Sequence, residues 1–208
     1  LEHSPTETVF NQDSADVNFR IESNNQDHLF FVDGGNDGIG IGNSTIIDWS
    51  TNYPGLQMGQ AGALYGHKSS NQMSFAMNWG VIGGNNYIVD GFAARVLFNT
   101  SGEISFDTAA SGSAAGDITA ISTLDMTATN IIFNEDSHDM DFRVESNNKT
   151  HALFVDAGND HVNIGGSGDL GGMLNVTGDA SVQIHSTDRH VMSLVSTEAG
   201  ASDGPRLV

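Results

Sequence analysis

Two short acidic segments carry the residue types that could hold a metal ion. Asp33-Gly-Gly-Asn-Asp37 and Asp156-Ala-Gly-Asn-Asp160 place carboxylate and amide oxygens close together, and calcium prefers oxygen ligands. Neither segment has the glycine and aspartate positions of the G-G-x-G-x-D calcium repeat, and neither has the glutamate that ends an EF-hand loop. We interpret both segments as hairpin turns with polar tips, and a weak surface calcium site is the alternative.

Eight histidines are a second set of candidate metal ligands. An axial metal site built on H-x-H spacing is excluded, because the closest pairs are His185 with His190 and His151 with His161. His28 and His151 lie 123 positions apart, which is the offset of an internal repeat, so we expect the same structural role for both. The sequence therefore predicts no metal site and no cofactor.

Carboxylates could also serve catalysis. A glycosidase needs two carboxyl groups about 5–9.5 Å apart across a sugar site. Asp90, Glu103 and Asp107 are candidates, but in a chain with 26 acidic residues such candidates are unavoidable and carry no information. The sequence contains neither G-x-S-x-G nor G-x-x-x-x-G-K, the motifs of serine hydrolases and phosphate-binding loops. We predict that the chain is not an enzyme.

Aromatic residues gather in the middle of the chain and could bind sugars. Both tryptophans and all three tyrosines lie there, and aromatic rings stack on sugar faces at a low entropy cost. We select four residues as candidate glycan-stacking residues: Trp49, Tyr53, Trp79 and Tyr87. The alternative is that these rings fill the core, and this is the favoured interpretation for Trp79.

The elements that must position these residues are organised around a repeat. Val9–Gly42 and Ile132–Gly165 align without a gap, and 20 of the 34 aligned pairs are identical. Within each copy, period-two alternation, a polar turn, a continuous apolar run and a glycine-rich turn predict three short strands. In the first copy these strands fall near residues 17–22, 29–32 and 39–41. Each copy has too few apolar residues to fold alone, so we expect it to pack against the rest of the chain or against sister chains.

The segment between the repeats predicts further strands. Met73-Ser-Phe75-Ala-Met77 and similar short alternating runs are separated by Gly, Asn and Ser clusters, and no window shows sustained helical periodicity. We predict an all-β fold in which short β-hairpin repeats flank a central β-rich domain, either a sandwich or a β-prism. The expected divisions are a first repeat module at 1–42, a central domain at 43–131, a second module at 132–165 and a β stalk at 166–208.

Three stretches of the chain resemble known proteins. FRVESNN…HALFVDAGNDHVNIGG, at 142–166, looks like the repeated segments of tail-fibre and appendage proteins of tailed bacteriophages. FNTSGEISFDTAASGSAAGDIT, at 98–119, resembles the segment between such repeats, and SLVSTEAGASDGPRLV, at 193–208, looks like the start of a further fibre section.

The resemblance implies an elongated homotrimeric fibre segment on a virion, assembled in the host cytoplasm. The implied role is to span distance and to support or contribute to host-surface attachment. Its partners would be sister chains, other virion proteins and a host glycan or envelope protein. A carbohydrate-binding adhesin module and a glycan-depolymerising tailspike are the alternatives.

Charge and composition exclude other classes of partner. The net charge of −19 repels phosphate, so we predict no nucleic-acid binding. No apolar run approaches the ~20 residues of a membrane span, and no signal peptide is visible, so we predict no membrane insertion. Cysteine is absent, which excludes disulfides and thiolate metal sites. The abrupt end at Pro205-Arg-Leu-Val208 leads us to expect an internal fragment of a longer polypeptide.

Overall fold

The computed structural model describes residues 2–3, 7–11, 13–168 and 174–176. These residues form strands, turns and loops, with no helix among them, which confirms the all-β prediction. The chain divides into two compact units, Leu1–His138 and Asp139–Val208.

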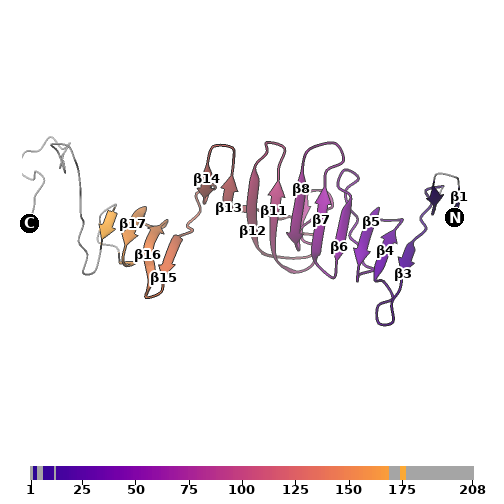
Figure 1. The fold of residues 1–208 in the computed structure, drawn as a ribbon, viewed down its shortest axis with the longest axis horizontal. Helices are drawn as coiled ribbons and strands as arrows, with labels where there is room; N and C mark the ends of the chain where they lie inside the picture. Colours follow the sequence, from indigo (N-terminus) through magenta and orange to yellow (C-terminus); the bar gives the residue numbers. More distant parts are fainter. Residues whose placement is uncertain (1, 4–6, 12, 169–173, 177–208) are drawn as a thin grey trace, which may run out of the picture. The chain divides into compact units, whose positions relative to one another are not determined.

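The first unit is built on one sheet of ten strands (Figure 1). In spatial order these are β14 (Ile131–Phe133), β13 (Ile121–Met126), β12 (Ile104–Gly112), β11 (Gly91–Phe98), β8 (Met73–Met77), β7 (Gly62–Gly66), β6 (Gly55–Met58), β5 (Gly38–Ile41), β4 (Phe30–Asp33) and β3 (Phe19–Ile21). Neighbouring strands are antiparallel, except that β5 and β6 are parallel. Two small hairpins complete the unit: β1 (Glu2–His3) with β2 (Thr8–Val9), and β9 (Gly80–Val81) with β10 (Asn85–Asn86).

The second unit is a sheet of four strands. It runs in the order β15 (Phe142–Ser146), β16 (Lys149–Asp156), β17 (His161–Ile164) and β18 (Leu174–Val176). The last pair is parallel and the others are antiparallel. The predicted stalk over 166–208 lies outside the described residues, apart from 166–168 and 174–176.

The two repeats have the same strand pairing. Phe19 lies opposite Val32 in the first copy, and Phe142 lies opposite Val155 in the second, at the same offset of 123 positions. In each copy three antiparallel strands are followed by a parallel fourth strand, β6 or β18. Strands β3, β4 and β5 of the first repeat and most strands of the central segment belong to one sheet, and 1–42 and 43–131 lie in the same compact unit.

The equivalence also extends backwards beyond the 34 aligned residues. Glu2 pairs with Val9 in the β1–β2 hairpin, and Asp125 pairs with Ile132 in the β13–β14 hairpin, again 123 positions away. The second copy therefore begins inside the ten-stranded sheet, and the boundary between the two units falls within that copy.

Long loops cover one face of the ten-stranded sheet and form the core there. The buried apolar residues of this core are Phe31, Ile46, Trp49, Ala63, Tyr65, Trp79, Val81, Tyr87, Ile88, Ala93 and Ala109. The Trp49 ring lies over Gly55, where a Cβ atom would collide with it, and beside Gly38, where a Cβ atom would collide with Ile46. Glycine at these positions lets the 43–54 loop pack directly on the backbone of β5 and β6.

Buried amides attach the same loops to the sheet. The Gln57 side chain accepts a hydrogen bond from the Ile47 N–H at 3.2 Å and donates to the Thr45 carbonyl oxygen at 3.3 Å. Asn78 accepts from the Val89 N–H at 2.7 Å and donates to the Phe92 carbonyl oxygen at 3.0 Å. Because buried polar groups must be hydrogen-bonded, these contacts fix which face the loops cover.

Candidate functional site

The four candidate sugar-stacking residues lie in or against the core. Trp79, Trp49 and Tyr87 are 0%, 3% and 5% exposed. Trp79 Nε1 donates to Asn85 Oδ1 at 3.1 Å, and the Tyr87 hydroxyl donates to the Ala110 carbonyl oxygen. Tyr53 is half-buried, and its ring meets the rings of Tyr65 and His67 edge-on. A ring covered on both faces cannot stack on a sugar, so Trp49, Trp79 and Tyr87 serve the core.

The candidate carboxylates each make a local contact. Asp107 forms an ion pair with Arg95 at 2.7 Å, and the two side chains are only 5% and 9% exposed. The Arg95 guanidinium also lies over the Trp79 ring, 4.3 Å from its centroid, where a cation is attracted to the ring face. Asp90 accepts a hydrogen bond from the Ala114 N–H at 2.9 Å, and Glu103 accepts one from Asn99 at 2.6 Å. These contacts shape turns and the core.

The two acidic segments form turns in which the first aspartate is already hydrogen-bonded. Asp33 accepts from the N–H groups of Gly35 and Asn36 at 3.0 and 3.1 Å, and from the Asn36 side chain at 3.0 Å. Asp156 accepts from the N–H and the side chain of Asn159, both at 3.1 Å. Within the described residues no group of three His, Asp or Glu side chains is placed to hold a metal ion.

The repeated histidines support the same packing in both copies. The His28 ring meets Phe31 edge-on with centroids 5.1 Å apart, and His151 meets Phe154 in the same way at 4.9 Å. His28 Nδ1 also lies 3.2 Å from Asp27 Oδ1. This hydrogen bond, together with the charge of the His28 ring, lowers the pKa of Asp27 below its ordinary value.

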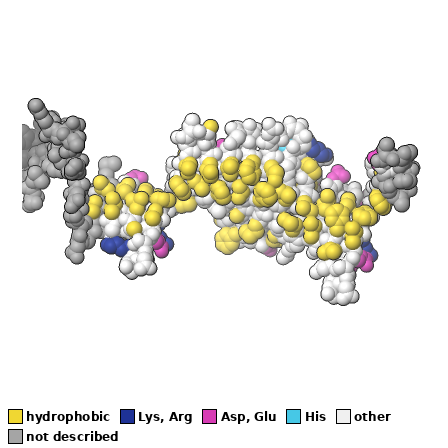
Figure 2. Space-filling view, in the orientation of Figure 1, with side chains coloured by type: hydrophobic (Ala, Val, Ile, Leu, Met, Phe, Trp, Pro, Cys, Tyr) yellow, Lys and Arg dark blue, Asp and Glu magenta, His cyan; other side chains and the backbone are white. Residues whose placement is uncertain are grey.

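The opposite face of the ten-stranded sheet is apolar and uncovered. A central row of one residue from every strand runs across it, each residue paired with the next: Phe19, Val32, Ile39, Leu56, Leu64, Phe75, Val96, Phe106, Leu124 and Phe133. None of the ten is buried, and Phe75 and Phe133 are 49% and 53% exposed. Figure 2 shows the resulting band of hydrophobic side chains across the strands.

A border row flanks the central row on each side. The Met77 border contains Ile21, Phe30, Ile41, Met58, Gly62, Met77, Ala94 and Thr108. The Gly66 border contains Gly66, Met73, Phe98, Ile104, Met126 and Ile131. We call the three rows together the apolar face. The residues named in the three rows are uncharged, and Pro54 and Asp37 lie next to Gly66 along its border, on the β6 and β5 side.

The second unit has an apolar face of the same kind. One row contains Phe142, Val155, Val162 and Leu174, and the next contains Val144, Leu153, Ile164 and Val176. Leu174 is 62% exposed, and Val144 and Ile164 are both 42% exposed. Both repeats therefore expose the same pattern of apolar side chains.

The apolar face of the first unit is extensive. Its central row crosses ten strands about 4.8 Å apart and is about 43 Å long, and the border rows lie about 6.7 Å to either side, over eight strands and six strands. Its outline falls within the range of the largest apolar patches of monomeric proteins, which are often functional. The face is therefore a candidate interaction surface.

The sequence contained part of the signal for this face. Alternation in the Met73–Met77 run placed three large apolar side chains on one side of a strand. It did not show which side the loops would cover, because the loops are anchored by residues far away in sequence.

Comparisons with known proteins give no relative for this chain: no protein-family profile, curated protein or solved structure matches it. The residues that the structure describes include no helix long and apolar enough to cross a membrane. A proposal for the function of this chain therefore rests on its apolar face.

Proposed function

We propose that this chain is a structural segment of a tail fibre or similar virion appendage, in which three copies pack their apolar faces around a common axis. The segment spans distance and supports or contributes to attachment at a host surface. The observation that carries the proposal is the row of ten apolar side chains, one from each strand, that the chain leaves uncovered. The resemblance of the repeats to phage fibre segments supplies the biological setting.

The spacing of the central row favours another sheet as its partner. Its side chains repeat about every 4.8 Å, the distance between neighbouring strands. An α-helix repeats every 5.4 Å, so it would fall out of step along a surface of this length. A second copy of this chain has the same spacing along its whole face, and burying the face in an assembly would remove its apolar side chains from water.

The distribution of charge is compatible with self-association. The chain carries a net charge of −19, yet the three rows of the apolar face are uncharged. Copies can therefore meet through this face while their acidic groups stay in water, where salt screens them over about 8–10 Å. The same acidic groups oppose non-specific contacts between fibres.

The mass of the chain in solution tests the proposal. We expect light scattering to give about 66 kDa, three times the chain mass of 22.0 kDa. Phe75→Asp places a charge in the middle of the apolar face and should yield a folded monomer, because burying an unpaired carboxylate is costly. A wild-type chain that is folded and monomeric at every concentration measured would overturn the proposal.

A further inference from the structure

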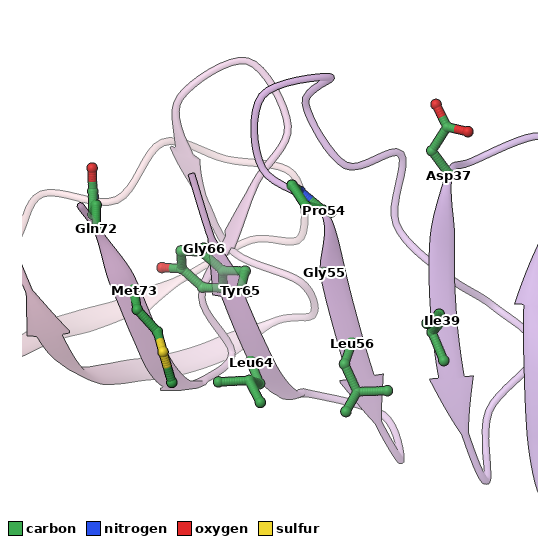
Figure 3. Close-up of a pocket in the computed structure, with 10 residues that line it drawn as sticks. All are labelled: Asp37, Ile39, Pro54, Gly55, Leu56, Leu64, Tyr65, Gly66, Gln72 and Met73. Carbon is green, nitrogen blue, oxygen red and sulfur yellow. The ribbon is translucent and has the colours of Figure 1, made fainter. Parts of the chain in front are cut away.

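The apolar face has a groove at β7. This strand has glycine at both borders, Gly62 and Gly66, so Leu64 is its only large side chain on this face. The groove has a volume of about 420 Å³, and its walls include the apolar side chains of Ile39, Leu56, Leu64 and Met73, while Asp37 and Gln72 also line it. Figure 3 shows these side chains on neighbouring strands, with Gly66 contributing no side chain between them.

We propose that this groove receives the Met77 side chain of a neighbouring copy. The proposal rests on the fibre assembly proposed above and names the contact that fixes the alignment of its chains. When copies are related by rotation about an axis along the central row, the Gly66 border of one copy meets the Met77 border of the next at the same strand level.

The sizes of the facing side chains at these levels indicate that Met77 is the residue that enters the groove. At the level of β7, Gly66 faces the neighbour's Gly62, which leaves a hollow. At the level of β8, Met73 faces the neighbour's Met77, so two long side chains compete for one space. The hollow at the level of β7 is adjacent to the crowded layer at β8. A Met77 side chain that bends into the hollow fills it and leaves more space for Met73.

Met77 has the properties that this contact requires. It is 51% exposed in the single chain, so its own sheet does not hold it in place. Methionine is unbranched and flexible, and it fills irregular apolar gaps. Met58, on the other side of the hollow in the same border, is also exposed. At the level of β6 the neighbour's border residue is Pro54, a smaller side chain than the Met73 that faces Met77, so Met58 is less crowded.

Position 66 has room for a side chain at the cost of one tight contact. A Cβ atom there would lie 3.2 Å from the Gln72 carbonyl oxygen, so the β7–β8 turn must shift by a few tenths of an ångström, and Gly66 is not among the glycines with positive φ. Gly66→Leu should still fold as a single chain, since leucine avoids the entropy cost of glycine in a strand. Any loss of assembly then reports on the neighbour's side chain.

A size-swap experiment tests the contact. Gly66→Leu fills the groove and should weaken association at least tenfold, measured by analytical ultracentrifugation, with circular dichroism confirming the fold. Met77→Ala should weaken association as well, because it leaves the groove empty. The double variant, Gly66→Leu with Met77→Ala, restores the volume and should recover most of the affinity. Gly66→Leu with Met58→Ala is the matched control and should show no recovery.

A cross-linking experiment provides independent evidence. The protein has no cysteine, so a chain with Gly66→Cys and Met77→Cys carries only these two thiols. The two positions lie on adjacent strands but four residues apart in register, about 13 Å, so a short bismaleimide joins them only between chains. Linked oligomers on a denaturing gel are expected from this variant.

The outcomes separate this inference from the proposed function. If the wild-type chain assembles but Gly66→Leu assembles equally well, the Met77 contact is wrong and the fibre proposal stands. The same conclusion follows if the double variant is no better than Gly66→Leu. If the wild-type chain never assembles, both proposals are overturned.

Discussion

Leu64 of β7 lies directly opposite Phe75 of β8, and both side chains stand on the face of the sheet that the loops leave open. On the other face of the same two strands, Ala63 and Ser74 are buried beneath the loops. One pair of strands thus shows the division of the whole sheet, with a core on one side and an uncovered apolar surface on the other. That division separates the residues that control stability from those that control assembly in the proposed fibre.

A cysteine in the central row should link chains to each other. Val96→Cys places one thiol in the middle of the row, where its copies meet around the axis. Mild oxidation should produce disulfide-linked pairs and leave about one chain in three unlinked, because three thiols form one bond. The measurement is a non-reducing gel. Thr100→Cys, at an exposed turn, is the control and should remain unlinked at the same concentration.

The Arg95–Asp107 pair should be important for the stability of the core. Asp107→Ala leaves the Arg95 guanidinium buried without its counter-charge, and breaking a buried pair costs about 3–5 kcal/mol. Arg20→Ala is the control, because the Arg20–Glu22 pair is about half exposed and such pairs contribute about 0–1 kcal/mol. Urea unfolding followed by tryptophan fluorescence measures both, and equal losses would contradict the assignment.

Gly55 should be sensitive to the smallest substitution. Gly55→Ala drives a methyl group into the Trp49 ring, and overpacking of this kind typically costs about 1–3 kcal/mol. Gly84→Ala is the matched control, since nothing lies within 4 Å of a Cβ atom there. Thermal unfolding should show a lower Tm for Gly55→Ala and little change for Gly84→Ala. A neutral Gly55→Ala would mean that the loop does not pack on β6 as described.

The titration of Asp27 should depend on His28. The hydrogen bond and the charge of His28 lower the pKa of Asp27 below 3.8. The folded chain favours the charged form of Asp27. The contribution of the Asp27–His28 contact to folding stability is therefore present above pH 3.8 and is lost as the pH falls through the lowered pKa. Carboxyl carbon NMR should show Asp27 titrating at lower pH than in the His28→Ala variant. An unchanged titration would contradict the contact.

The strands were predictable from sequence because their signals are local. The runs near 17–22, 29–32 and 39–41 correspond to β3, β4 and β5, and the Met73–Met77 alternation corresponds to β8.

The candidate site was less predictable because burial depends on distant residues. Trp49 lies among polar loop residues in the sequence, yet it is covered because its loop folds back over Gly38 and Gly55. The Trp79 ring is covered partly by Arg95, which is 16 positions away on β11. A short window of sequence does not reveal that a glycine makes room for the Trp49 ring or that Arg95 covers the Trp79 ring. For the same reason alternation could locate the apolar residues but not the face that stays open.

The shared pairing of β1–β2 and β13–β14 has a consequence for how such proteins can vary in length. The second repeat ends one sheet with its first hairpin and begins another with its remaining strands. A duplication or deletion of 123 codons would therefore leave the junction between the two units intact. Each added block would carry its own apolar face. Growth by whole modules would lengthen the protein without the need to evolve a new joint.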